Sequence, residues 1–114
     1  WHGTSNKIFL FEAPIDMLSY ISMHKDNWKS YSYAASCSVS DRVLFQCLKD
    51  NSNIKNVFLC FDNDEAGQTA NKRIADKLNT MNIQNKILIP KHKDWNEDLK
   101  FAEEGDEKLC RQVL

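Results

Sequence analysis

The sequence has no run of about 18 apolar residues, no signal-peptide pattern at its start and no excess of basic residues. The first absence argues against a membrane span and the second against export, so we expect a cytoplasmic protein without membrane partners. The formal net charge is −1, and no global field would draw the chain onto nucleic acid. Any nucleic-acid contact therefore depends on a local basic patch or on neighbouring domains.

None of the four cysteines belongs to a C-x-x-C pair, the spacing typical of zinc sites and redox motifs. Cys60 lies in an apolar run and Cys47 in a helical pattern. We interpret the cysteines as reduced, mostly buried thiols of a cytoplasmic protein rather than as zinc ligands.

Internal repeats, low-complexity tracts and composition changes that would mark a domain boundary are also missing. The 114 residues, of which 42% are hydrophobic, suit one domain with a single core. The chain begins with Trp1 rather than Met, so we expect residues 1–114 to be a single domain of a longer protein. A processed start would look the same.

Short continuous apolar runs alternate with helical patterns along the chain. The runs predict strands over residues 7–11, 30–36, 56–61 and 85–90. Helical periodicity follows over residues 13–24, 38–51 and 65–81 and, after a polar loop, within 91–114. This alternation predicts an α/β fold, a mainly parallel four-stranded sheet flanked by helices.

Spacings of three and four residues predict which helical side chains point inward. The expected inward positions are Ile15, Leu18, Tyr20, Ile21 and Met23 in the first helix, Val43, Leu44, Cys47 and Leu48 in the second, and Ala66, Ala70, Ile74, Leu78 and Met81 in the third. In the last helical segment they are Leu99, Phe101 or Ala102, Leu109 and Val113. Ser38 or Ser40 is the expected cap of the second helix. Gly105 is expected to divide the last helical segment into two pieces.

Acidic residues follow three of the four predicted strands. Glu12 follows the first strand, Asp62 and Asp64 the third, and the loop after the fourth brings Asp94 and Asp98. Parallel strands place all of them at one edge of the sheet, where open parallel sheets bind their ligands. Clustered carboxylates repel one another, and a divalent cation removes that penalty. Ligand sets made of oxygen alone suit Mg²⁺ or Mn²⁺.

Each acid also has a purely structural interpretation. Asp62 or Asp64 alone would suit the start of a helix, and Glu12 would suit a first helical turn. Asp16 lies four residues after Glu12, and it either supports the same edge or faces water. The coincidence at three strand ends favours the cation site.

The loop before Asp94 is basic. Lys91, His92 and Lys93 could steer a phosphate backbone, and we assign Lys91 and Lys93 to nucleic-acid binding. A solvated run of charge is the commoner explanation for such a loop. Trp95 would either stack on a base or anchor its own loop, which is the more frequent role.

Three stretches together resemble the Toprim domain, which bacterial primases, type IA and type II topoisomerases, small nucleases and recombination proteins share. They are FLFEAPIDMLSY, VFLCFDNDEAGQTA and KDWNEDL. The resemblance covers roughly residues 7 to 100 and is nearest to Toprim-like domains in proteins of plasmids, conjugative transposons and other mobile elements. Ala13 departs from the glycine that many relatives carry there, and Asn96 replaces an acid found in many primases.

The resemblance implies roles for individual residues. Asp62 and Asp64 would hold Mg²⁺, and Glu12 would act as general acid or base or as a second metal ligand. Asp94 and Asp98 would complete a second metal site. Gly67 matches the glycine that follows the Asp-x-Asp motif in primase-like members.

The function implied by the resemblance is a Mg²⁺-dependent domain that acts on DNA or RNA. Its reaction would be primase-like nucleotidyl transfer or phosphodiester cleavage, within a DNA-replication or DNA-processing protein of a mobile element. A non-catalytic module that binds metal or nucleic acid and needs partner domains is the alternative. A phosphorylation receiver is a third hypothesis, but receivers carry their acidic pair after the first strand rather than the third.

Overall fold

Strands and helices alternate from end to end of the computed structural model, which describes residues 1–37 and 40–113 and, beyond residue 104, the backbone alone. The strands are β1 (Lys7–Phe11), β2 (Ser32–Ala35), β3 (Asn56–Cys60) and β4 (Gln84–Ile87). The helices are α1 (Pro14–Met23), the short 3-10 helix η1 (Trp28–Ser30), α2 (Arg42–Asp50), α3 (Glu65–Thr80) and α4 (Trp95–Val113).

The strands form one sheet in the order β2-β1-β3-β4, and every neighbouring pair is parallel. This arrangement confirms the predicted α/β fold. It also places the carboxyl ends of all four strands at the same edge, which we call the rim. Among the described helices, none is long and apolar enough to cross a membrane.

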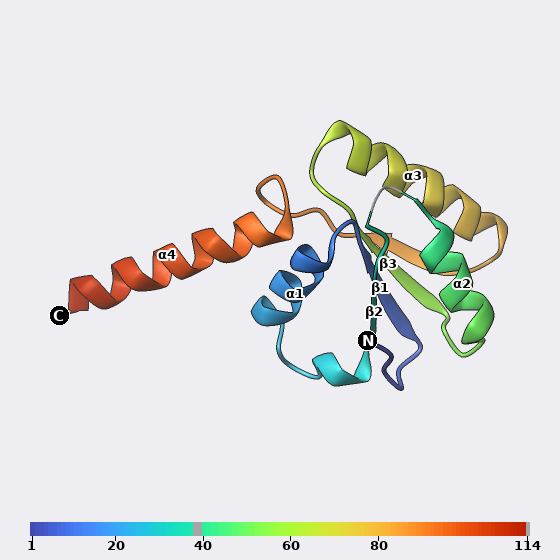
Figure 1. Cartoon of the computed structure of the whole chain (residues 1–114), viewed down its shortest axis with the longest axis horizontal. Coiled ribbons are helices and arrows are strands. Elements are labelled where there is room, and N and C mark those ends of the chain that lie inside the picture. Colours follow the sequence, from blue (N-terminus) through green and yellow to red (C-terminus); the bar gives the residue numbers. More distant parts are fainter. Residues whose placement is uncertain (38–39, 114) are drawn as a thin grey trace.

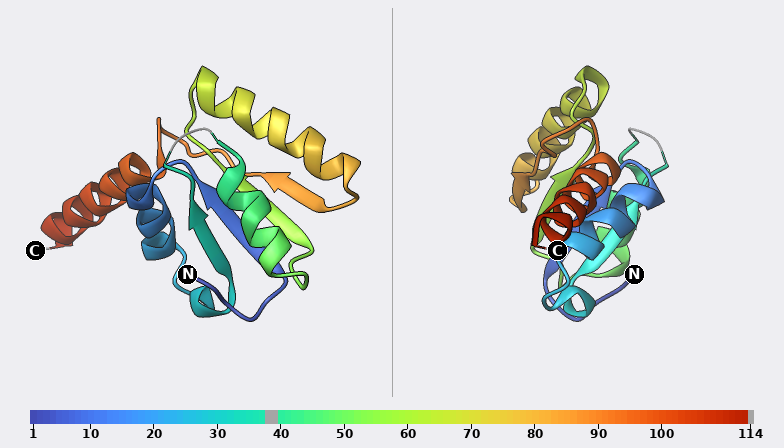
Figure 2. Two further views of the ribbon diagram at one scale, coloured as in Figure 1. Left: turned by 45° about the vertical axis from the view of Figure 1, so that its right-hand side comes forward. Right: turned by 90° about the vertical axis from the view of Figure 1, so that its left-hand side faces the viewer.

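Helices cover the two faces of the sheet with separate cores. On one face, Leu10 and Leu59 pack with side chains of α2 and α3 such as Leu44 and Ile74. On the other face, an aromatic core around Phe11 packs against α1 and the start of α4. Figure 1 shows α2 and α3 on one side of the strands and α1 on the other, while α4 runs outward from the sheet, as the left view of Figure 2 also shows.

The inward face of α1 differs from the prediction in its first turns, whereas Tyr20, Ile21 and Met23 pack against the aromatic core as predicted. Ile15 and Leu18 are each 58% exposed, whereas Asp16 and Ser19 are buried. The reason is that α1 meets the start of α4, where Asn96 accepts a hydrogen bond from the Ser19 hydroxyl and donates its backbone N–H to Asp16. These polar contacts between two helices, which periodicity does not register, accompany the burial of Asp16 and Ser19.

The predictions for α2 and α3 hold at their centres and fail toward their ends. Leu44, Ala70, Ile74 and Leu78 are buried, while Val43, Ala66 and Met81 are exposed. Ser40 accepts a hydrogen bond from the backbone N–H of Arg42, and Ser38 lies outside the described residues.

The predicted end of the fourth strand and the predicted break in the last helix are both wrong. The fourth strand ends at Ile87 rather than Pro90, because the chain leaves the ladder after the backbone N–H of Leu88 donates to Leu59. Helix α4 continues through Gly105 without a break. A single glycine inside a helix costs only about 1 kcal/mol and does not by itself end it.

Leu10 and Leu18 offer a matched test of this architecture. We expect Leu10→Ala to lower the free energy of unfolding by about 2–5 kcal/mol, because Leu10 is fully buried between strands and helices. Leu18→Ala should change it by less than about 0.5 kcal/mol. Urea denaturation of both variants measures the difference, and equal losses would contradict the observed orientation of α1.

Candidate metal centre

Three carboxylates from separate segments converge at the rim. In the described part of the chain, Asp16, Asp62 and Asp94 each offer one oxygen, and these atoms lie within 4.8 Å of one another. Asp16 belongs to the first turn of α1, Asp62 follows β3, and Asp94 directly precedes α4. The parallel sheet brings the three segments together because each of them leaves a strand at its carboxyl end.

Asp62 lies where a negative charge is energetically unfavourable, because the residue is buried. Asp62 is 9% exposed, and its Oδ1 atom has no hydrogen-bond partner among the residues that the structure describes. A buried carboxylate oxygen without a partner is costly unless it carries a proton or meets a cation. The surroundings of Asp62 therefore suit a divalent ion bound by oxygen ligands.

The same crowding changes the pKa values at the rim. Burial raises the pKa of Asp62 to about 7, and Glu12 adds to this through a shared hydrogen bond and through its charge. Burial also raises the pKa of Asp16 to about 6, against the lowering effect of the Asn96 backbone N–H. The charges of Asp94 and Asp62 raise it further. Near neutral pH, protons compete with any cation for these oxygens.

Glu12 lies beside Asp62 but outside the group of three converging oxygens. It comes directly after β1 and is only half-buried. This placement brings Glu12 together with Asp62, as the sequence leads one to expect. Its role as general acid or base, or as a second metal ligand, stays a prediction.

Asp64 caps helix α3. Its Oδ1 atom accepts the backbone N–H of Gly67 at 2.7 Å, which leaves its second oxygen for the predicted metal. Gly67 packs so closely on Asp62 that a Cβ atom there would lie 2.2 Å from the Asp62 carbonyl oxygen. The same carbonyl accepts a hydrogen bond from the Gln68 side chain at 3.0 Å. The first turn of α3 thus fixes the backbone that carries Asp62.

Asp94 has the corresponding task at α4, where its Oδ1 atom accepts the backbone N–H of Glu97 at 2.8 Å. The next residue, Trp95, donates its indole N–H to the Cys60 carbonyl at 2.9 Å and is buried. This contact confirms that Trp95 anchors its own loop. These two contacts hold Asp94 at the start of α4.

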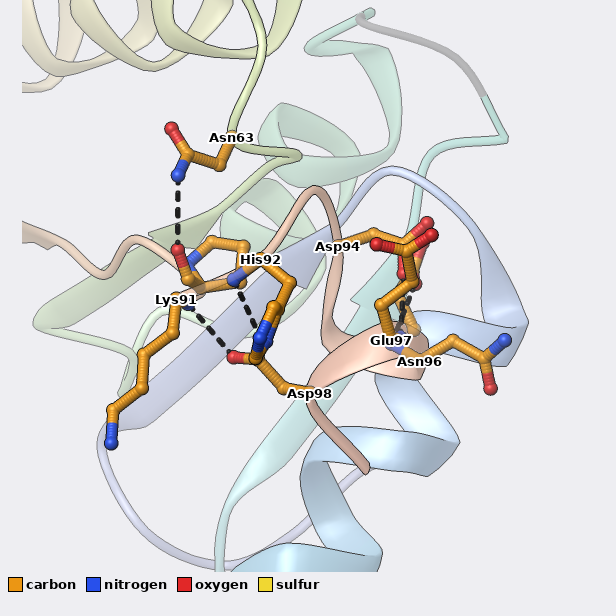
Figure 3. A network of polar contacts seen from close by, with 9 residues as sticks. Asn63, Lys91, His92, Asp94, Asn96, Glu97 and Asp98 are labelled. Carbon is orange, nitrogen blue, oxygen red and sulfur yellow. Dashed lines mark hydrogen bonds and ion pairs between the residues drawn. The ribbon is translucent and has the colours of Figure 1, made fainter. Parts of the chain in front are cut away.

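Both carboxylate oxygens of Asp98 accept hydrogen bonds from the loop that precedes α4 (Figure 3). One oxygen accepts the backbone N–H of Lys91, and the other accepts the backbone N–H and the ring Nδ1 of His92, at 2.7–2.9 Å. Burial would raise the pKa of Asp98, but these hydrogen bonds outweigh it and lower the pKa. The assignment of Asp98 to a second metal site stays a prediction, since its oxygens already serve the loop.

Lys91 and Lys93 are exposed on this loop. In Figure 3 the ammonium group of Lys91 points away from Asp94. Their predicted role in nucleic-acid binding remains untested by this geometry.

Two features of the site go beyond the sequence interpretation. Asp16, expected either to support the site or to face water, is buried and converges with Asp62 and Asp94; its spacing of four from Glu12 carried that signal. Asn63 and Asn96 hold the rim together through hydrogen bonds, and no sequence signal singled out either contact.

The sequence model of the Toprim-like family matches residues 9–99. The chain belongs to this family. The Toprim-like domain is 25% identical over 122 residues to the uncharacterised protein pXO2-78 of Bacillus anthracis, an alignment that covers 94% of this chain and 36% of that protein. It therefore spans about a third of the length of that relative.

Two solved structures share the fold of this Toprim-like domain. The primase fragment of the bacteriophage T7 primase-helicase has a TM-score of 0.64 and 22% identity, with 100% of this chain and 46% of that chain covered. A chain in the complex of T7 lagging-strand DNA polymerase with primase domains of two gp4 subunits, bound to an RNA/DNA hybrid and dTTP, has a TM-score of 0.60 and 23% identity. There the cover is 99% of this chain and 55% of that chain. The domain spans about half of each.

The raised pKa of Asp62 predicts a particular pH dependence of stability. Because the folded pKa of about 7 exceeds the ordinary 3.8, the folded chain keeps a proton that the unfolded chain loses, and stability falls as pH rises between these values. Metal-free Asp62→Asn should exceed wild type at pH 8 by on the order of 2 kcal/mol.

Urea denaturation in the presence of a chelator measures this gap, which should close below pH 4. Mg²⁺ at pH 8 should stabilise wild type and leave Asp62→Asn almost unchanged. A gap of the same size at every pH would show that the substitution acts through packing rather than through charge.

Gly67 gives a second prediction, this one about backbone packing. Gly67→Ala should cost about 2 kcal/mol or more, because its Cβ atom would collide with the Asp62 carbonyl rather than with a flexible side chain. Thr69→Ala, at an exposed position of the same helix, is the control and should change stability by less than about 0.5 kcal/mol. Thermal unfolding that moves equally in both would rule out the close approach.

Proposed function

We propose that the protein is a catalytic Toprim domain that uses a divalent cation, Mg²⁺ or Mn²⁺, to act on nucleic acid by primase-like nucleotidyl transfer or phosphodiester cleavage. The observation that carries the proposal is the unpartnered, buried oxygen of Asp62 at the point where Asp16 and Asp94 converge. Glu12 stands beside it as a group able to take or give a proton.

The cation would be held by Asp62, Asp16 and Asp94. The second oxygen of Asp64 would be available as a further ligand. Magnesium prefers oxygen ligands and usually keeps several waters, so a few carboxylates at a rim suit it better than a closed cage. When bound, the cation would stabilise negative charge on the phosphodiester in transfer or cleavage. Asp98 would contribute to a second site only by giving up its hydrogen bonds to the loop.

Glu12 and Asp62 divide the remaining work by their exposure. Asp62 is buried and suited to holding charge in place, whereas Glu12 is half-buried and therefore more accessible to solvent. A general base has to reach the proton that it removes. Glu12 is therefore the group that we assign to proton transfer at the reacting hydroxyl or water.

Nucleic acid as the substrate is supported by the family and by its relatives. The T7 structures with this fold are primase chains or their complex with an RNA/DNA hybrid. The Bacillus anthracis relative bears the name pXO2, which supports a role in a plasmid or another mobile element. DNA or RNA and further domains of a longer protein are the proposed partners, with Lys91 and Lys93 as backbone contacts. The match to the Toprim-like family weighs against a phosphorylation receiver.

Metal titration followed by incubation with labelled single- and double-stranded oligonucleotides and nucleotides tests the proposal. Wild type should show product only with Mg²⁺ or Mn²⁺. Asp62→Asn and Glu12→Gln should each lower that activity at least about 100-fold. Asp76→Asn, an exposed acid on the outer side of α3, should retain it.

The variants also separate catalysis from simple binding. Glu12→Gln should still bind Mn²⁺, whereas Asp62→Asn should bind it much more weakly. Metal binding by wild type without any turnover would favour the alternative, a binding module that depends on partner domains. Turnover that survives Asp62→Asn would overturn the assignment of the site.

A further inference from the structure

Asn63 stands between two candidate metal ligands, Asp62 and Asp64, but its side chain serves a different segment. Its Nδ2 atom donates to the Pro90 carbonyl at 3.2 Å, and its backbone N–H donates to the Lys93 carbonyl at 2.7 Å. Figure 3 shows the amide nitrogen directed at the loop before α4. A single residue thus holds both ends of the stretch from Pro90 to Lys93.

The loop needs this support because the sheet does not supply it. Strand β4 ends at Ile87, and Leu88 makes the last backbone hydrogen bond to β3, through the Leu59 carbonyl. The residues that follow must find other partners before α4 begins at Trp95. Asn63 provides them from the β3 side.

Asp98 provides the matching support from the α4 side. It accepts the backbone N–H groups of Lys91 and His92, the two residues between the carbonyls that Asn63 holds. Four consecutive loop residues, Pro90 to Lys93, are thereby tied to fixed elements on either side. The loop delivers Asp94 immediately after the last of these contacts.

Electrostatic repulsion opposes this delivery. Asp94 converges with Asp16 and Asp62, and carboxylates gathered this closely repel one another. Without support, the loop would move Asp94 toward water and away from the site. Because these hydrogen bonds order the loop before the ion binds, little further conformational entropy is lost on binding.

We propose that Asn63 is a positioning residue, which holds the Pro90–Lys93 loop at the rim so that Asp94 meets Asp62 before a cation binds. This inference rests on the proposed metal site. It assigns no contact with the ion to Asn63, whose amide nitrogen is committed to Pro90. Asn63 acts through Asp94.

The test uses the full chain with two variants and one control. Asn63→Ala removes the amide, and Asn63→Leu keeps its size without its hydrogen bond. Asn53→Ala, at an exposed asparagine in the turn before β3, is the control. The probe is Mn²⁺ alone, titrated under electron paramagnetic resonance, and amide hydrogen exchange is measured by NMR on the metal-free proteins.

We expect both Asn63 variants to bind Mn²⁺ about tenfold more weakly than wild type. In the metal-free state, the His92 and Glu97 amides should exchange about two- to tenfold faster. Amides of α2 should be unaffected, because the change is local. The control should match wild type in every measurement.

Three results would overturn the inference. Unchanged Mn²⁺ affinity and exchange in both variants would remove the role of Asn63 while leaving the proposed metal site intact. Weaker Mn²⁺ binding with unchanged metal-free exchange would make Asn63 a ligand rather than a positioning residue. Absence of Mn²⁺ binding by wild type would instead overturn the proposed function, and this inference with it.

Discussion

Repulsion among carboxylates that are gathered at one rim and partly removed from water is the constraint on which this structure depends. Asp16, Asp62 and Asp94 are brought together by the parallel sheet, and burial raises the pKa values of the first two. If these three carboxylates served no function, replacing any one of them with an amide would stabilise the fold. The cost points to a ligand of opposite charge.

Two helix starts reduce the cost without abolishing it. Asp64 and Asp94 each give one oxygen to a backbone N–H in the first turn of α3 or α4, where the helix dipole also favours negative charge. Capping and metal binding are therefore not exclusive interpretations of these residues. One oxygen of each carboxylate fixes its position, and the other remains for chemistry. Asp62 does not cap a helix, and its buried Oδ1 atom, which has no hydrogen-bond partner among the described residues, is the feature of the site that most favours a bound cation.

Contacts between loops complete the rim. Asn63 joins the segment after β3 to the segment before α4, and Asn96 joins α4 to Asp16 and Ser19. Trp95 adds a buried anchor on the aromatic face of the sheet. Of these contacts, the one from Asn96 orients an acidic side chain directly, that of Asp16, while the others hold the backbone segments that carry Asp62 and Asp94. Such contacts hold the segments of the rim next to one another.

Hydrophobic period and chain direction are local properties, so the sequence by itself determined that four strands alternate with helices in a parallel α/β sheet. It also determined that Glu12, Asp62 and Asp94 arrive at a common edge of that sheet. It did not determine how α1 is turned or which acids share one point. Those depend on hydrogen bonds between segments 77 to 80 residues apart, such as that from Asn96 to Asp16. Tertiary structure alone decided that Asp16 is buried and that Asn63 faces Pro90, since each outcome requires two distant segments to meet.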